Sequence, residues 1–396
     1  MKRSLLAICV GLCLVAAEGG DAEAQRLETK ARQAYVIEAS TGAVLLAKAP
    51  DLPFAPASLA KLMTMEVVFD ALSSGRLKPD QLFTISENAW RTGGAPSGTS
   101  TMFAKVRSQV AVSDLIQGVI IQAANDGAIA LAEGFAGSEA AFAEIMNRRA
   151  QELGLSSSQF RNATGLPAEG QRVTARDLVR LAQHIWLTYP DYYRIYSQPD
   201  FTWNGITQRN RNPMLKLDIG ADGMGTGYTE ADGYSLLGAV RSGDLRFFGV
   251  LAGLSSEKER AEEARALFDW ASRSFRRAIG FRRGEVVGDA EVYGGEKGTV
   301  TLKVAGPAPL LLPAEGVPGS VEARIVYDGP LPAPVRMGDQ VASLEIRIAG
   351  TLSQSVPLYA AETVEEGSIY RRAADAVGSL FASLWHRILP SRILPS

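Results

Sequence analysis

The residue types that carry most hydrolytic chemistry are scarce in this chain of 396 residues. The two histidines, His184 and His386, are far apart and have no metal-ligand spacing around them. The two cysteines, Cys9 and Cys13, both lie in a segment with the features of a signal peptide. A histidine-rich zinc site and a cysteine nucleophile are therefore excluded, and a Ser-His-Asp triad would have to use one of these two histidines. A serine paired with a lysine is the remaining simple route to a nucleophile.

Ser58 and Lys61 form such a pair, in a Ser-x-x-Lys pattern that follows Pro56 and opens a helical apolar periodicity. Residues three apart share one helix face, so the lysine amine can reach the serine hydroxyl. The helix N-terminus offers partial positive charge and backbone N–H groups where an oxyanion would form. A lysine partly desolvated there can lose its proton near neutral pH and act as a general base.

The pattern alone is weak, because Ser255 and Lys258 repeat it. The surroundings separate the two occurrences. Ser58 lies among apolar residues, whereas Ser255 precedes a charged run. We expect the second occurrence to be a capped, solvated helix start with no chemistry.

Apolar patterning predicts the elements that position these residues. Strands are expected at 34–38, 44–47, 236–240 and 247–251, the last two joined by a turn at 241–244. Helical periodicity, broken at 124–127, predicts helices at 59–68, 115–122, 128–133, 141–153, 174–186 and 257–275. Strands, then helices, then strands and a helix favour an α+β fold with an antiparallel sheet over alternating βαβ units.

The first domain is assigned residues 25–278, and the pattern of the sequence changes after it. Short β-like runs alternate with Gly and Pro, which predicts a small all-β domain at 279–366. The last segment, 367–396, places Trp and Phe on one helical face and basic residues on the other. This pattern favours an amphipathic helix on a membrane surface. The alternative is a helix packed on its own β domain.

The N-terminus has the pattern of a secretory signal peptide. Lys2 and Arg3 precede a short apolar run, and a small-x-small exit ends at Ala24, which predicts a signal at 1–24. The alternative is an uncleaved anchor, although the run is short for a membrane span. The mature protein would carry no thiol. With 41 basic against 43 acidic side chains, nothing in the composition points to a nucleic-acid partner.

Four segments resemble one family in the same order. Residues 56–64, reading PASLAKLMT, are similar to the nucleophile motif of low-molecular-mass penicillin-binding proteins, the D-alanyl-D-alanine carboxypeptidases. Residues 124–133 look like its second-motif region, 162–167 (NATGLP) also look like the family, and 222–229 look like its third-motif strand. The resemblance covers nearly the whole chain and implies a β-lactamase/transpeptidase-like domain, a β-rich C-terminal domain and an amphipathic tail.

Two positions depart from the family pattern. Ala123 stands where the second motif has serine, and Gly225 stands where the third motif has lysine. The serine would relay a proton to the leaving amine, and help of that kind is worth about 10²–10⁴ in rate. The lysine would hold the substrate carboxylate, and losing one partner of a buried charge pair costs about 2–5 kcal/mol. No obvious cation replaces it, although Thr226 remains as a hydroxyl donor.

The resemblance also implies roles for the residues that persist. Ser58 is the nucleophile, Lys61 is the base, and Asn125 binds the peptide amide of the substrate. The backbone N–H groups of Ser58 and Tyr228 form the oxyanion hole. The substrate-binding strand comprises Gly225, Thr226, Gly227 and Tyr228. Two simpler interpretations stay open: Asn125 as a turn-former ahead of Gly127, and Thr226 as an ordinary strand residue.

These observations favour a serine-type carboxypeptidase that removes terminal D-alanine from peptidoglycan stem peptides, with activity lowered by Ala123 and Gly225. No metal or organic cofactor is expected, and β-lactams would act as acylating inhibitors. The expected location is the periplasm, with peripheral attachment to the inner membrane. One alternative is a murein-binding scaffold with impaired catalysis. A β-lactamase is less favoured, because no clear match to its deacylating loop glutamate is found.

Overall fold

The computed structural model describes residues 5–6, 27–314, 321–348 and 350–373. The chain divides into two compact units, one comprising 26–275 and the other comprising 276–396 with 1–25. Apart from residues 5 and 6, the predicted signal peptide lies outside the described residues, and so does the tail beyond residue 373. Among the described helices, none combines the length and apolar character needed to cross a membrane.

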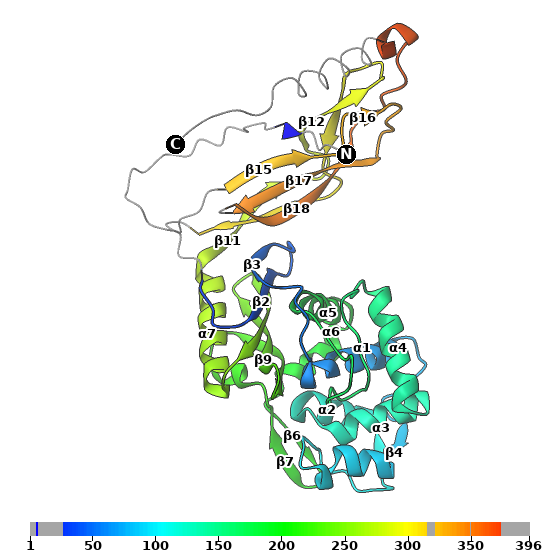
Figure 1. The fold of residues 1–396 in the computed structure, drawn as a ribbon, viewed down its shortest axis with the longest axis vertical. Coiled ribbons are helices and arrows are strands. Elements are labelled where there is room, and N and C mark those ends of the chain that lie inside the picture. The colour runs from blue at the N-terminus through cyan, green and yellow to red at the C-terminus, as the bar shows by residue number, and fades with distance from the viewer. Residues whose placement is uncertain (1–4, 7–26, 315–320, 349, 374–396) are drawn as a thin grey trace, which may run out of the picture. The chain divides into compact units, whose positions relative to one another are not determined.

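The first unit is built on a five-stranded antiparallel sheet in the order β3-β2-β10-β9-β8 (Figure 1). Its strands are β2 (Gln33–Glu38), β3 (Val44–Lys48), β8 (Ala221–Thr229), β9 (Gly233–Ser242) and β10 (Leu245–Leu254). The predicted hairpin of β9 and β10 is confirmed, as is the antiparallel α+β architecture. The order places β8 at one edge, so one side of this strand has no strand partner in the sheet.

Helices cover both faces of this sheet. Successive residues of a strand point to opposite faces, so two neighbouring residues of β10 show which helix lies on which face. A Cβ on Gly249 would lie 3.1 Å from Phe268 of α7 (Glu257–Ser274), which places α7 on that face. The neighbouring Phe248 packs its ring 6.0 Å from that of Trp186 in α5 (Ala175–Thr188), on the other face. Thr174 caps α5, since its side-chain hydroxyl accepts a hydrogen bond from the Asp177 N–H.

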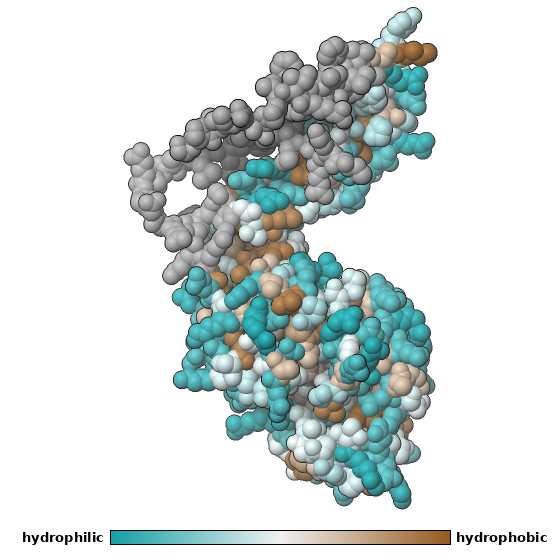
Figure 2. Space-filling view, viewed as in Figure 1, coloured by the Kyte–Doolittle hydropathy of each residue, from teal (hydrophilic) through white to brown (hydrophobic). Residues whose placement is uncertain are grey.

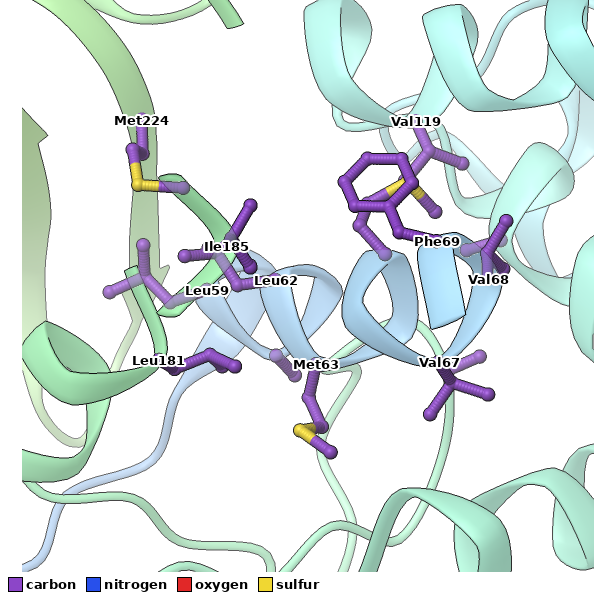
Figure 3. Close-up of a cluster of buried hydrophobic side chains, with 14 of the residues drawn as sticks. Leu59, Leu62, Met63, Val67, Val68, Phe69, Val119, Leu181, Ile185 and Met224 are labelled. Atoms are coloured by element: carbon purple, nitrogen blue, oxygen red, sulfur yellow. The ribbon is translucent and has the colours of Figure 1, made fainter. Parts of the chain in front are cut away.

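A helical layer surrounds α1 (Lys61–Ser73), which is preceded by the 3₁₀ turn η1 (Ala57–Ala60). Its neighbours are α2 (Val112–Gln122), α3 (Asn125–Ala136), α4 (Glu139–Glu152) and α6 (Pro190–Tyr193). Figure 3 shows apolar side chains on several sides of α1, with Met224 of β8 near Leu59 and Val119 of α2 over the helix. Because α1 is buried almost throughout its length, its first turn is held rigidly at the centre of the unit.

The predicted break between α2 and α3 is misplaced. The chain turns at Ala123, whose φ of 54° and ψ of 35° are left-handed, and α3 already begins at Asn125. Asn125 and Gly127 therefore belong to the first turn of α3 rather than to a loop. A left-handed residue ends α2 and reverses the chain within one position. The turn-forming residues Asn125, Asp126 and Gly127 had led the sequence analysis to place the break after this point.

Several short elements were not predicted. They are β4 (Leu82–Thr84), β5 (Gln109–Ala111), β6 (Asp200–Trp203), β7 (Ile206–Arg209), η2 (Ala89–Gly93), η3 (Ala95–Ser97), η4 (Arg194–Ser197) and η5 (Pro213–Lys216). The β6–β7 hairpin carries a recognisable signal in Asn204 and Gly205, a pair that favours tight hairpin turns. Its strands are mostly exposed and short, so their periodicity is faint.

The second unit is mainly β, as predicted. Its larger sheet has the order β1-β15-β17-β18-β13-β12-β16, and β11 pairs with β14. The strands are β1 (Leu5–Leu6), β11 (Phe275–Phe281), β12 (Val286–Tyr293), β13 (Thr299–Lys303), β14 (Ala308–Pro313), β15 (Val321–Val326), β16 (Leu331–Pro332), β17 (Gln340–Ile348) and β18 (Thr351–Ala360). A separate apolar core, which includes Val300, Leu302 and Leu358, stabilises it.

On the face of the first unit that Figure 2 shows, hydrophilic residues predominate and hydrophobic ones are dispersed. The large apolar side chains lie in its core instead, among them Phe69, Phe142, Phe160 and Phe248. Apolar burial therefore stabilises the unit, and its chemistry must be sought where polar side chains enter that core.

Candidate active site

Ser58 and Lys61 meet at the junction of η1 and α1. The Lys61 amine is 3.1 Å from the Ser58 hydroxyl oxygen. Residues three apart are eclipsed in a 3₁₀ turn, so the tight start of this helix aligns the two side chains more closely than an α-helical start would. Lys61 is only 4% exposed, whereas Ser58 is half-buried and faces a cleft. The contact predicted from the spacing is present.

The electrostatic surroundings of Lys61 favour a neutral amine. The pKa of Lys61 is lowered to about 7, chiefly by burial and in addition by the positive charge of Arg211. The carboxylates of Asp126 and Glu139 act in the opposite direction and offset part of the effect. At neutral pH a large fraction of Lys61 can therefore accept a proton from a neighbouring hydroxyl.

A loop distant in sequence completes the support of this pair. The Thr164 carbonyl oxygen lies 2.6 Å from the Lys61 amine. One residue earlier, the Ala163 carbonyl accepts a hydrogen bond of 2.7 Å from the Thr64 hydroxyl. The segment 162–167, which sequence analysis singled out without a role, thus positions the lysine. A backbone carbonyl carries no signature in a sequence, which is why this role was missed.

The same loop packs against the backbone that precedes the nucleophile. Gly165 has a φ of 81°, and a Cβ there would lie 1.7 Å from the Ala57 carbonyl oxygen. Ala57 itself has a φ of 47°, a left-handed conformation that strains an alanine. Only glycine permits this close approach. The packing of Gly165 therefore helps to hold the strained turn that presents Ser58.

The second-motif corner is built at the N-terminus of α3. Ala123 lines the cleft with its methyl group, so no hydroxyl faces Ser58 from this position. Asn125 is 4% exposed, and its Nδ2 donates a 2.9 Å hydrogen bond to the Thr99 hydroxyl. Its Oδ1 is buried and has no hydrogen-bond partner among the described residues. Asn125 therefore keeps an acceptor to offer, although it is not among the residues that line the cleft.

Asp126 fixes the loop beside this corner. Its buried carboxylate accepts hydrogen bonds from the Thr101 hydroxyl and from the backbone N–H groups of Met102, Ala104 and Gly127. Burial raises the pKa of Asp126, and these hydrogen bonds oppose the rise. The carboxylate thus ties residues 101–104 to the start of α3 and keeps the second-motif corner in place.

The third-motif strand is β8, at the sheet edge. Gly225 and Thr226 line the cleft, and a Cβ on Gly227 would lie 2.8 Å from the Pro56 carbonyl oxygen. Gly227 therefore brings β8 directly against the backbone before Ser58. Tyr228 is 51% exposed, and its ring packs 4.4 Å from that of Tyr234. Gly227 and Tyr228 are not among the residues that line the cleft.

The start of β8 is anchored by an ion pair. The Arg246 guanidinium makes two hydrogen bonds, of 2.9 and 2.6 Å, to the two carboxylate oxygens of Asp222. The Tyr193 hydroxyl donates to the same carboxylate at 2.7 Å, and Arg246 also lies over the Trp186 ring. Bidentate pairing of this kind fixes geometry as well as charge. The ion pair thus fixes the start of β8 and thereby the position of residues 225–228, which follow it.

The cleft brings together five of the predicted residues: Ser58, Lys61, Ala123, Gly225 and Thr226. It encloses about 410 Å³ of empty space, part of which is open to solvent. Polar residues that sequence analysis did not select also line it: Tyr196, Asn210, Arg211 and Asn212. None of the described residues that line it is an aspartate or a glutamate. Arg211 is a cation that lines the same cleft as Gly225.

A serine and a lysine in contact at the start of a buried helix, beside the edge of an antiparallel sheet, are typical of serine-type acyl hydrolases. Residues 20–255 match the family model of the D-alanyl-D-alanine carboxypeptidases, peptidase family S11. Residues 280–366 match that of the penicillin-binding protein 5 C-terminal domain. The chain therefore belongs to the D-alanyl-D-alanine carboxypeptidase family, and the family resemblance is confirmed.

Individual relatives agree with this assignment. The chain is 35% identical to D-alanyl-D-alanine carboxypeptidase DacD of Escherichia coli K12 over 363 residues, which are 91% of this chain and 93% of the relative. Penicillin binding protein 5 from Haemophilus influenzae superposes with a TM-score of 0.72 at 33% identity, covering 86% of this chain and 99% of that one. Penicillin-Binding Protein D2 from Listeria monocytogenes, solved with cefotaxime bound, has a TM-score of 0.56 at 27% identity and covers 61% of this chain and 97% of that one.

Proposed function

We propose that this protein removes the terminal D-alanine from peptidoglycan stem peptides through an acyl-enzyme on Ser58. The observation that carries the proposal is the 3.1 Å contact between the Ser58 hydroxyl and a buried lysine whose pKa is lowered to about 7. Membership of a family of serine-type carboxypeptidases supports the same reaction.

The reaction proceeds in two halves. The Ser58 oxygen attacks the carbonyl carbon of the penultimate D-alanine while its proton passes to the Lys61 amine. The C–N bond then breaks, the leaving D-alanine nitrogen takes up the proton that Lys61 had accepted, and an ester on Ser58 remains. Water attacks this ester while giving a proton to Lys61. The ester C–O bond breaks, the Ser58 oxygen takes this proton back from Lys61, and the shortened peptide leaves as a carboxylic acid.

Three further features serve the substrate in this proposal. The backbone N–H groups of Ser58 and Tyr228 stabilise the oxyanion, and the free Oδ1 of Asn125 accepts a hydrogen bond from a peptide N–H. The unpaired edge of β8 at Gly225 and Thr226 is open to an extended peptide. These contacts use backbone groups and side chains that the two motif departures leave in place.

The departures lower the rate of the first half-reaction. With a methyl group at Ala123, the proton from Lys61 has no hydroxyl relay toward the leaving nitrogen and must travel through water. Acylation by β-lactams is less affected, because the broken ring amide stays tethered to the enzyme and its protonation can be slow. We therefore expect penicillin labelling to survive better than peptide hydrolysis.

One pair of assays tests the proposal. The mature protein is incubated with a fluorescent penicillin and, separately, with diacetyl-L-lysyl-D-alanyl-D-alanine. Labelling that Ser58→Ala abolishes and Ser255→Ala leaves intact, together with release of D-alanine, supports it. Absence of labelling, or labelling that persists in Ser58→Ala, contradicts it. Restoring Ala123→Ser and Gly225→Lys should raise D-alanine release by about 10²-fold or more.

A second candidate is a murein-binding scaffold with impaired turnover. The specific observation in its favour is that Ala123 and Gly225 both line the cleft, so both departures fall where the substrate would bind. Penicillin labelling without D-alanine release would support this function over the first. A β-lactamase is the least favoured alternative, because no carboxylate among the described lining residues can activate the deacylating water. Rapid turnover of penicillin would support it.

The proposed location follows from the substrate, since peptidoglycan lies outside the cytoplasmic membrane. Cleavage of a signal after Ala24 and membrane attachment through 367–396 are part of this proposal. Of that tail, residues 369–373 form a helical turn in which Ile369 and Tyr370 are exposed by 74% and 89%. N-terminal sequencing of the secreted protein and fractionation of a variant truncated after residue 366 test the two claims.

A further inference from the structure

One buried hydroxyl of the cleft has no part in the mechanism described above. Tyr196 of η4 is 3% exposed and lines the cleft together with Ser58, Lys61 and Ala123. Its hydroxyl is buried and has no hydrogen-bond partner among the described residues. A buried hydroxyl without a partner is costly, so we expect a ligand or an ordered water to satisfy it.

The position of Tyr196 is fixed by its surroundings. Asn210 donates two hydrogen bonds through Nδ2, to the carbonyl of Tyr196 at 3.2 Å and to that of Gln198 at 2.9 Å. The Tyr196 ring packs 5.9 Å from the ring of Tyr193. A Cβ on Gly223 would lie 3.6 Å from the Tyr196 Cβ, so this side chain packs directly against the start of β8. These contacts keep the ring in the wall of the cleft, where its hydroxyl must find a partner.

The phenol of Tyr196 can both donate and accept a hydrogen bond. Burial, with a smaller contribution from the charge of Glu66, raises the pKa of Tyr196, so the phenol stays protonated at physiological pH. Asn212 is the other described residue of the cleft wall with an unpartnered buried atom, but its Nδ2 only donates. A water in a proton chain changes between donor and acceptor as the proton passes. The Tyr196 hydroxyl can follow that change, and an amide N–H cannot.

The phenol and the Lys61 amine line one cleft without contacting each other. The amine donates to the Thr164 carbonyl at 2.6 Å and lies 3.1 Å from the Ser58 hydroxyl oxygen, whereas the Tyr196 hydroxyl has no partner among the described residues. Ordered waters commonly bridge polar groups that are too far apart for a direct hydrogen bond. The methyl group of Ala123 leaves free, in the same cleft, the space that a serine oxygen would fill.

We propose that Tyr196 is a positioning residue that holds a water beside Lys61, and that this water replaces the hydroxyl missing at Ala123. The inference rests on the proposed function, because it completes the acylation step of that mechanism. Once Lys61 has taken the Ser58 proton, the water accepts a proton from Lys61 and gives one of its own to the leaving D-alanine nitrogen. The C–N bond breaks, the water is regenerated and Lys61 is neutral again. The Tyr196 hydroxyl donates a hydrogen bond to the water oxygen and orients it throughout.

The test uses a change of leaving group. Tyr196→Phe removes the hydroxyl and keeps the ring in its packing. The substrates are diacetyl-L-lysyl-D-alanyl-D-alanine and the matching ester that ends in D-lactate, each at saturating concentration. An amide nitrogen must be protonated before it leaves, whereas the oxygen of an ester needs far less help. Tyr196→Phe should therefore lower release of D-alanine about tenfold and release of D-lactate by less than about twofold. A purely structural role would lower both to the same extent.

A second background sharpens the test. With a serine hydroxyl in place in Ala123→Ser, the water is no longer needed, so the effect of Tyr196→Phe on D-alanine release should shrink to less than about twofold. Tyr192→Phe is the matched control, since it removes the hydroxyl of a nearby tyrosine that is not among the residues lining the cleft. It should leave the release of both products within about twofold of the parent in either background.

The outcomes separate this inference from the proposed function. Equal losses for the two substrates, an undiminished loss in the Ala123→Ser background, or no loss from Tyr196→Phe would overturn the role of Tyr196. A protein that penicillin does not label on Ser58 contradicts the acyl-enzyme and the relay together. A protein that is labelled, but releases no D-alanine or releases it unchanged in Tyr196→Phe, keeps its acyl-enzyme and loses only the relay.

Discussion

The chain has two serine–lysine pairs with the same spacing at the start of a helix, Ser58 with Lys61 and Ser255 with Lys258. Only in the first pair do the two side chains contact each other. The Lys61 amine lies 3.1 Å from its serine and is buried. The Lys258 side chain is 86% exposed and lies 3.7 Å from Glu262. Ser255 instead donates a 2.5 Å hydrogen bond to the Glu259 carboxylate. The expectation that this second pattern is a capped, solvated helix start is confirmed.

The difference comes from the rest of the molecule rather than from the four residues. Lys61 enters a helix that is surrounded by core, and a carbonyl 103 residues away accepts its hydrogen bond. Lys258 enters a helix whose first turn faces water. The spacing of three residues therefore allows the lysine amine to reach the serine hydroxyl, and burial lowers the pKa of the lysine. Four sets of measurements can sharpen or break this comparison.

The largest difference is expected on removing the amines. Lys61→Met should lower the rate of acylation by a fluorescent penicillin about 10²–10⁴-fold, because the serine loses its general base. Lys258→Met, the matched change at the second pattern, should leave the rate within about twofold. Stopped-flow or time-course labelling measures both. Equal rates for the two variants would contradict the role of Lys61.

The next effect tests the loop that supports Lys61. Gly165→Ala should cost about 2–4 kcal/mol of unfolding free energy and lower acylation at least about tenfold, because the new Cβ overlaps the Ala57 carbonyl. Gly137→Ala is the control, since Gly137 has the same φ of 81° and a Cβ added there would meet no atom within 4 Å. Its cost should be about 1–2 kcal/mol, without loss of labelling. Urea unfolding gives the free energies.

The third prediction concerns pH. Because the folded pKa of Lys61 is about 7, acylation should rise as pH increases through 7 and the amine loses its proton. Arg211→Ala should move this limb to higher pH, since the Arg211 charge lowers the Lys61 pKa. Between about pH 7 and the ordinary lysine value of 10.5, the unfolded chain binds more protons here, so unfolding free energy should rise with pH. A flat profile of acylation against pH would contradict the assignment.

The smallest effect belongs to the second pattern. Ser256 caps α7, because its hydroxyl accepts a hydrogen bond from the Glu259 N–H. Ser256→Ala should cost about 1 kcal/mol of unfolding free energy and leave acylation unchanged. Thermal unfolding and penicillin labelling of the same preparation check both expectations. A loss of labelling would show that this helix start is not merely structural.

The sequence predicted those features that local patterns encode. Strong apolar periodicity located α5, α7 and the start of α1 closely, and apolar runs located β9 and β10. The four motif segments pointed to the correct family. The spacing put Ser58 and Lys61 within reach of each other, and the apolar residues around Ser58 distinguished this pair from Ser255 and Lys258.

Other features depend on tertiary structure and were missed. Arg211 follows an exposed hairpin, and nothing in its neighbourhood of polar residues shows that this segment folds onto the end of α2. Thr164 contributes a carbonyl that any residue could supply. The left-handed turn at Ala123 is adopted by a residue that rarely takes this conformation, so composition placed the break too late.

The missing side chain at Gly225 has a consequence for inhibitors. Drugs of the β-lactam class carry a carboxylate, and on this protein the wall of β8 at that point is bare backbone near Leu59. A compound optimised to grip an amine there would gain nothing from it. A Cβ at Gly225 would meet only Leu59 Cδ2, at 3.8 Å, so an inhibitor for this chain can be sought by adding a small apolar group at this place rather than a charge.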